Sequence, residues 1–295
     1  MFPGLKRNNK LLLATGFKGM GKTFSTMILL RKYITGNPSL GVHPRQVLIF
    51  DVNDEYDEFQ IRAIHVKDTA VYSIQKKFEI RRIRPFMDQE TYNKIFPGNP
   101  NGIKIPPGKW VRMNTEHQLA MLGYLLENFK YGLLLIEDIN KYVGDSMPQD
   151  LTGTICTNRH ANCDIMMHYQ SSGRPLPKIW QNADEVRFHY QTDEVDKGKL
   201  KDSYELFKIA QILVNIEFEK GNVRFYVWIN KITGKIIGNF TKDMFLFAIK
   251  EYLATHPKLL QPLLIRRDGE GKKVYTYPQA ENAMSIKLFN KFWGN

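Results

Sequence analysis

The chain has 295 residues, 43% of them hydrophobic, and a formal net charge of +12 from 42 Lys and Arg against 30 Asp and Glu. This length and hydrophobic content exclude a disordered chain and suffice for one large α/β core with appendages. No apolar run approaches the length of a membrane span and the first residues lack the apolar stretch of a secretion signal, so we expect a cytoplasmic protein without a membrane span.

Residues 16–23 read G-F-K-G-M-G-K-T and fill every fixed position of the phosphate-binding pattern G-x-x-x-x-G-K-[ST]. A short apolar run at residues 9–15 predicts a strand before this loop, and the apolar spacing of residues 23–35 predicts a helix after it. Backbone N–H groups of such a loop bind nucleotide phosphates, Lys22 reaches the β- and γ-phosphates, and the Thr23 hydroxyl ligates Mg²⁺. The residues that we predict to bind ATP or GTP are Gly16, Lys18, Gly19, Met20, Gly21, Lys22, Thr23 and Phe24.

Further along the chain we predict a strand at residues 46–51, strand-like segments at 63–66 and 78–84, a turn-rich surface excursion at 86–109 and a helix at 115–130. Thr115 is the expected cap of that helix. The alternation of strands and helices predicts an α/β fold with a mainly parallel central sheet flanked by helices.

Residues 131–138 (Y-G-L-L-L-I-E-D) predict a buried strand that ends in two carboxylates, the second acidic element that a phosphate-binding loop needs to complete a Mg²⁺ site. The usual order is Asp and then Glu, whereas here Glu137 precedes Asp138. Either Glu137 holds the metal and Asp138 activates the attacking water, or Asp138 holds the metal. A third interpretation is that the two carboxylates only cap the next helix.

A helix ending at Arg159 and a strand ending at Gln170 are predicted next. Gln170 can orient the attacking water or sense the γ-phosphate, and Arg159 can act as an arginine finger on a neighbouring subunit's nucleotide. The alternative for Arg159 is a cation that stabilises the helix C-terminus. Cys156 and Cys163 match neither a zinc pattern nor a disulfide pattern, so we expect buried thiols.

The order of these motifs resembles the HerA/FtsK superfamily of ring-forming ATPases that pump DNA, including viral packaging ATPases and conjugation motors. The positions that match the family pattern outside the first loop are Asp51, Glu55, Tyr56, Glu137, Asp138, Arg159, Gln170, Arg174, Pro175, Asn182, Ala183, Asp184 and Val186. The resemblance covers about residues 9–192 and implies a Mg²⁺-dependent ATPase that forms a ring, most often hexameric. The Glu137–Asp138 order departs from the common form, and Asp51 and Glu55 have the alternative role of capping a loop.

The family pattern fades beyond residue 195. There we predict a helix at residues 197–219, a β-hairpin turning at Thr233 and Gly234, and an amphipathic helix at 241–256. The predicted organisation is an ATPase core at 1–195, a small α+β extension at 196–256 and a basic aromatic arm at 257–295. This arm either packs on its own chain, wraps onto a neighbouring protomer, or docks on a capsid or membrane complex.

The basic residues are dispersed along the chain, which favours sequence-independent binding to the phosphate backbone of double-stranded DNA. A basic surface without a specific partner is the alternative. Together with the resemblance, this charge leads us to expect a viral genome-packaging motor that acts in the host cytoplasm and in the virion. Two other functions stay open: a filamentous-phage-type assembly or secretion ATPase, and a nucleotide-binding structural protein with little hydrolysis.

Overall fold

The computed structural model describes residues 9–37, 39, 42–56, 80–99, 102–139, 148–157 and 162–295. The described residues form two compact units. The first comprises the described parts of residues 1–14, 21–170 and 174–183, and the second comprises residues 15–20, 171–173 and 184–295. No helix in these ranges is both long enough and apolar enough to cross a bilayer.

The first unit is built on a mainly parallel sheet, as predicted. Its strands are β1 (Leu11–Thr15), β7 (Asp164–Tyr169), β6 (Gly132–Ile136), β2 (Gln46–Phe50) and β3 (Ile80–Ile83), in this order across the sheet. Adjacent strands from β7 to β3 pair in parallel. Every residue of β1, β2, β6 and β7 is buried, which explains why their sequences are nearly continuous apolar runs.

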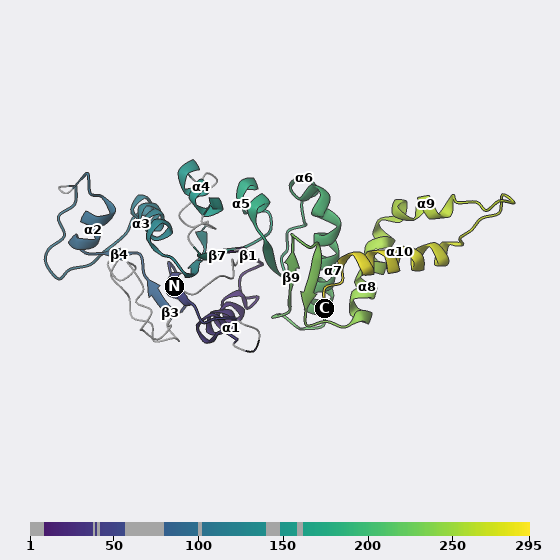
Figure 1. Ribbon diagram of the computed structural model, residues 1–295, viewed down its shortest axis with the longest axis horizontal. Coiled ribbons are helices and arrows are strands. Elements are labelled where there is room, and N and C mark those ends of the chain that lie inside the picture. The colour runs from purple at the N-terminus through teal and green to yellow at the C-terminus, as the bar shows by residue number, and fades with distance from the viewer. Residues whose placement is uncertain are drawn as a thin grey trace. The chain divides into compact units, whose positions relative to one another are not determined.

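Helices cover both faces of this sheet. Figure 1 shows α1 (Lys22–Thr35) on one face, and α3 (Thr115–Asn128) and α4 (Gln149–Thr157) on the other. Helix α5 (Pro177–Asn182) completes the unit. The predicted cap of α3 was wrong by one residue: the Asn114 side chain accepts the hydrogen bond from the His117 N–H at 2.8 Å, and Thr115 is the first helical residue.

The predicted turn-rich excursion contains a short helix that sequence reasoning missed. Helix α2 (Gln89–Ile95) is capped by Asp88, and the antiparallel strands β4 (Phe86–Met87) and β5 (Val111–Arg112) close the excursion at its base. Pro85 before these seven helical residues, and Pro97 and Gly98 after them, hid the helix from the pattern.

The second unit combines an antiparallel strand group with helices. Strands β8 (Glu185–His189), β9 (Tyr226–Asn230) and β10 (Lys235–Gly238) pair in that order, and β9 and β10 form the predicted hairpin with Gly234 at a φ of 66°. The single helix predicted at 197–219 is instead α6 (Lys197–Leu200), a 3₁₀ turn at Lys201–Ser203 and α7 (Tyr204–Glu219). The interruption falls at Lys201, whose φ is 43°.

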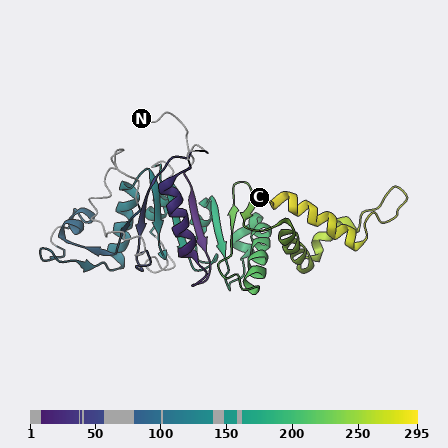
Figure 2. The same cartoon turned by 90° about the horizontal axis from the view of Figure 1, so that it is seen from below.

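The C-terminal arm packs within its own unit. The remaining elements are α8 (Lys242–Thr255), a 3₁₀ turn at Pro257–Leu260, α9 (Gln261–Leu264) and α10 (Tyr277–Phe292). Figure 2 shows α10 beside α8, and the two helices are in contact. The rings of Phe245, Phe289 and Trp293 pack together at centroid distances of 4.9 to 5.9 Å. The arm therefore packs on its own chain through this aromatic cluster, and its contacts with a neighbouring protomer or a docking partner stay predictions.

Candidate nucleotide and magnesium site

The loop between β1 and α1 has the backbone that phosphate binding requires. Gly16, Gly19 and Gly21 have φ angles of 152°, 87° and 75°, which glycine adopts far more readily than other residues. Gly21 is the N-cap, so α1 begins at Lys22 and its first N–H groups have no acceptor within the helix. A helix N-terminus of this kind attracts anions through its partial positive charge and its N–H donors. The local geometry thus fits the predicted phosphate site.

The first half of this loop is held by β8, within the second unit. The ring of His189 donates a hydrogen bond from Nδ1 to the carbonyl of Met20 at 3.0 Å, since a carbonyl can only accept. The Phe17 N–H donates to the carbonyl of Tyr190 at 2.8 Å. A Cβ added to Gly16 would lie 2.5 Å from the Cβ of His189. The close approach of these two backbones explains why residue 16 has no side chain.

Three parallel strands of the first unit run side by side to one edge of the sheet, where β2 and β6 end and β7 continues to Tyr169. In the register of β2, β6 and β7, Phe50 is opposite Ile136, and Ile136 is opposite Met167. The next residue on each strand is polar and buried: Asp51 (0% exposed), Glu137 (3%) and His168 (2%). Ligands of open α/β sheets bind at this carboxyl edge, so the sheet brings Glu137 to the predicted position.

Glu137 belongs to a buried chain of hydrogen bonds. Its Oε1 atom accepts from the Tyr56 hydroxyl and from His168 Nδ1, which lies 2.9 Å away. The other ring nitrogen of His168 lies 2.9 Å from the Thr26 hydroxyl on α1, accepting from it when the ring is neutral and donating to it when the ring is charged. The chain Tyr56–Glu137–His168–Thr26 therefore links the acidic strand end to the helix that follows the phosphate-binding loop.

The surroundings of Glu137 keep its side chain ionised. Burial by itself raises the pKa of this carboxyl group, but attraction to His168, the hydrogen bonds from His168 and Tyr56, and the charge of Lys22 together outweigh burial. The pKa of Glu137 is therefore lower than its ordinary value. Lys22 is thus close enough to the acidic strand end to stabilise its negative charge.

A second carboxylate reaches the predicted Mg²⁺ ligand. The Thr23 hydroxyl donates a hydrogen bond to Glu55 Oε2 at 2.9 Å. Glu55 lies in the segment after β2, and its own N–H donates to the Asp51 carboxylate at 3.2 Å. The guanidinium group of Arg82 on β3 binds both Asp51 and Asp54, at 3.2 and 2.7 Å. Asp51 caps this segment, as one interpretation held. Glu55 belongs to the capped segment and also binds the Thr23 side chain.

The other predicted residues lie around this edge with different surroundings. Asp138 has a positive φ of 41° and accepts a hydrogen bond from the Asn53 amide at 3.4 Å. Gln170 follows β7 and is exposed, and the described residues give its side chain no hydrogen bond. Lys18 and Phe24 are exposed on the loop and on the first turn of α1. Arg159 lies outside the described residues, so its finger role stays a prediction.

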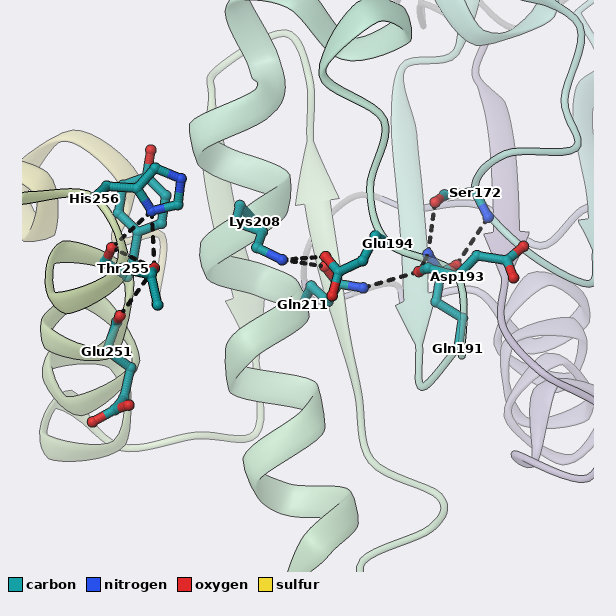
Figure 3. A network of polar contacts seen from close by, with 10 residues as sticks. Ser172, Gln191, Asp193, Glu194, Lys208, Gln211, Glu251, Thr255 and His256 are labelled. Atoms are coloured by element: carbon teal, nitrogen blue, oxygen red, sulfur yellow. Dashed lines mark hydrogen bonds and ion pairs between the residues drawn. The ribbon is translucent and has the colours of Figure 1, made fainter.

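The turn that directly follows Gln170 is fixed by side chains of the second unit (Figure 3). The Ser172 N–H donates to Gln191 Oε1 at 2.9 Å, and the Gln191 amide donates back to the Ser172 hydroxyl at 2.7 Å. Both Gln191 and Gln211, on α7, donate to the carbonyl of Asp193 at 3.0 Å. These bonds tie the turn at residues 171–173 to the segment after β8 and to α7, within the second unit.

These residues fit a magnesium nucleotide. The glycine-rich turn and the helix N-terminus offer N–H donors for phosphate oxygens, and Lys22 adds a positive charge. Thr23 and the carboxylates beside it are the oxygen ligands that Mg²⁺ prefers. When bound, Mg²⁺ would neutralise charge on the β- and γ-phosphates.

Sequence reasoning missed His168 altogether. The signal that could have revealed it is a polar residue inside the run D-I-M-M-H-Y, because a fully buried strand rarely carries a histidine without a partner. Among the predicted thiols, Cys163 is buried as expected and Cys156 is half-buried.

Comparisons with known proteins find no matching protein-family model and no matching curated protein. Solved structures do match. The genome packaging NTPase B204 of Sulfolobus turreted icosahedral virus 2, in complex with AMP, is 15% identical over 79% of this chain and 98% of that chain, with a TM-score of 0.45. The N-terminal domain of zonular occludens toxin from Neisseria meningitidis is 13% identical over 67% of this chain and 91% of that chain, with a TM-score of 0.34.

ATPases 2 and 3 of EssC from Geobacillus thermodenitrificans are 14% identical over 65% of this chain and 34% of that chain, with a TM-score of 0.34. The chain is thus similar in structure to solved NTPases, among them one that packages a viral genome.

Proposed function

We propose that this chain is a Mg²⁺-dependent ATPase that translocates double-stranded DNA as an oligomeric ring, with genome packaging as its task. The observation that carries the ATPase proposal is the meeting of two elements at one edge of the sheet. Lys22 and Thr23 lie at the N-terminus of α1. Glu137 is buried near them, and the positive charge of Lys22 helps to lower the pKa of its carboxyl group. A phosphate-binding loop facing a carboxylate is the arrangement that phosphoryl transfer to water requires.

Each residue has a task in this proposal. The loop N–H groups hold the phosphates in one orientation, and Lys22 stabilises the negative charge that develops on the leaving oxygens. Thr23 and an acidic side chain hold the metal. Asp138 or Glu137 takes the proton of the attacking water, and Gln170 orients that water. Because His168 and Tyr56 already bind Glu137 Oε1, we favour Asp138, the more exposed of the pair, as the base.

The DNA part of the proposal rests on charge and on the motif order that resembles DNA-pumping ATPases. A net charge of +12 favours a polyanion, and its dispersal along the chain suits contacts to the phosphate backbone without base reading. In a ring, Arg159 would complete a neighbouring subunit's site, and the preferred ring is a hexamer.

The ATPase proposal is tested by comparing Lys22→Ala with Lys32→Ala. Both remove one lysine from α1, but Lys32 is exposed in its last turn. We expect ATP turnover to fall by about 10²-fold or more in Lys22→Ala, because the positive charge that stabilises the transferring phosphoryl group is lost. Lys32→Ala should keep wild-type turnover. Equal turnover in both variants would refute the assignment of the phosphate-binding loop.

The motor proposal is tested by measuring turnover with and without double-stranded DNA while the ring is imaged with an ATP analogue. Stimulation by DNA and DNA density in a central pore are the expected results. Nucleotide binding without any DNA-stimulated turnover would favour the structural or assembly protein instead. Stimulation only by protein-coated single-stranded DNA would favour the filamentous-phage-type ATPase.

The finger role of Arg159 is tested by mixing two inactive variants. Arg159→Ala lacks the finger, and Glu137→Ala lacks the acidic strand end. If the finger acts between subunits, a mixed ring contains some sites with both groups intact, and the mixture should recover part of the turnover. A mixture as inactive as its parents would argue for a role within one subunit.

A further inference from the structure

Two consecutive residues, Glu55 and Tyr56, each bind one of the two predicted Mg²⁺ ligands. Glu55 accepts the hydrogen bond of the Thr23 hydroxyl at 2.9 Å, and the Tyr56 hydroxyl donates to Glu137. The two residues have opposite exposure, since Glu55 is exposed and Tyr56 is fully buried. Glu55 is thus the carboxylate at this edge that reaches solvent beside Thr23.

The position of Glu55 is set from both sides. On its N-terminal side, Asp51 and Asp54 are bound to Arg82, and the Glu55 N–H donates to Asp51 at 3.2 Å. On its C-terminal side, Tyr56 is anchored through Glu137. Because these anchors come from the neighbouring strands β3 and β6, the carboxylate of Glu55 is held near Thr23 by the sheet itself.

We propose that Glu55 is a direct ligand of the nucleotide-bound Mg²⁺, beside Thr23. This inference rests on the proposed nucleotide site and adds a ligand to it. Mg²⁺ holds its six oxygens octahedrally at about 2.0–2.1 Å, so neighbouring ligand oxygens lie about 2.9 Å apart. Thr23 Oγ1 and Glu55 Oε2 are 2.9 Å apart. The hydrogen bond therefore holds Thr23 Oγ1 and Glu55 Oε2 at the spacing that adjacent magnesium ligands need. On metal binding, contacts of both oxygens with Mg²⁺ would replace this hydrogen bond.

This assignment gives the two glutamates different tasks. Oε1 of Glu137 accepts two hydrogen bonds in a buried position, which suits a residue that fixes the sheet edge and stabilises Lys22. Glu55 sits where a hydrated cation can arrive from solvent. It also places a negative charge beside the phosphates whenever the metal is absent. Glu55 should therefore weaken ATP binding without Mg²⁺ and strengthen it with Mg²⁺.

The opposite effects of Glu55 on ATP binding without and with Mg²⁺ provide the test. Binding of a fluorescent ATP analogue is measured in EDTA and during a Mg²⁺ titration, for the wild type, Glu55→Gln and the control Glu90→Gln. Glu90 is a half-exposed surface glutamate of α2, paired with Lys94 at 3.4 Å. In Glu55→Gln we expect the Mg²⁺ concentration for half-maximal binding to rise by about 100-fold or more, because loss of a partner that only orients a ligand already costs about 10-fold to 100-fold in metal affinity. In EDTA the same variant should bind the analogue at least as tightly as the wild type.

An unchanged Mg²⁺ requirement in Glu55→Gln would overturn the inference, and so would weaker binding in EDTA, which would indicate a structural role. Glu55→Asp gives a second check, since its shorter side chain keeps the charge and should lose part of the Mg²⁺ affinity. The electron paramagnetic resonance spectrum of Mn²⁺ in the nucleotide complex should also change in Glu55→Gln and not in Glu90→Gln. If the wild type itself binds no analogue, the proposed function fails, and that result is distinct from a Glu55 variant that behaves like the wild type.

Discussion

Replacing Gly16 by alanine tests how closely β8 approaches the phosphate-binding loop. The added Cβ would lie 2.5 Å from the Cβ of His189 and 3.2 Å from the carbonyl oxygen of Tyr190. Carbon atoms in contact are normally about 3.5–4.0 Å apart, so the new methyl group overlaps its neighbour by about 1 Å. His189 is fully buried and bound to Met20, so its backbone has no room to retreat.

The expected loss of stability has two parts. Overpacking of a closed core costs about 1–3 kcal/mol. Residue 16 has a φ of 152°, and a residue with a side chain pays about 1–3 kcal/mol more for such a backbone. The sum is a loss of about 2–6 kcal/mol in the free energy of unfolding, a large part of the stability of an ordinary domain.

Gly19→Ala is the matched control. Residue 19 has a φ of 87°, but a Cβ there would meet nothing within 4 Å. This variant should lose only the backbone part, about 1–3 kcal/mol. Urea unfolding of both variants isolates the overpacking cost as their difference. If Gly16→Ala loses no more stability than Gly19→Ala, the close contact with His189 does not exist as described.

Three further predictions follow from buried side chains. His168→Leu removes both hydrogen bonds of the ring and should cost about 3 kcal/mol in urea unfolding, so a loss under about 1 kcal/mol would contradict the buried chain. Burial lowers the pKa of Lys231 to about 8 from 10.5, so the folded protein releases this proton first and stability should rise between these pH values. Urea unfolding from pH 7.5 to 10 should show this rise in the free energy of unfolding for the wild type and not for Lys231→Met. Identical pH profiles of the two proteins would refute the lowered pKa of Lys231. Burial raises the pKa of Cys163 to about 12, so iodoacetamide at pH 8 should modify Cys156 first by mass spectrometry, and equal rates would contradict the burial.

The elements that the sequence predicted well are those whose signals are local. The phosphate-binding loop combines glycines that the backbone needs with an apolar strand before it and an amphipathic helix after it, all within 30 residues. The hairpin of β9 and β10 has its turn glycine between two alternating strands. In each case neighbours along the chain decide the structure, so pattern and propensity suffice.

The features that escaped prediction depend on contacts between distant segments. Glu55 meets Thr23 across 32 residues, in a segment after β2 that is bound to Arg82 on β3 through Asp51 and to Glu137 through Tyr56. The partner of Glu137 on β7 follows from the strand order, which no short pattern encodes. Helix α2 was hidden because turn residues flank a very short helix, and there the surrounding contacts outweigh local preference.

The contacts of β8 with the phosphate-binding loop also bear on how this protein can be shortened. His189 and Tyr190 bind Met20 and Phe17 across about 170 residues of chain, and Gly16 lies against His189. A fragment cut before β8 would keep the whole glycine-rich sequence motif and lose the strand that contacts its first half. A shortened chain that is meant to keep the shape of this loop therefore has to include β8 together with the elements that keep β8 folded.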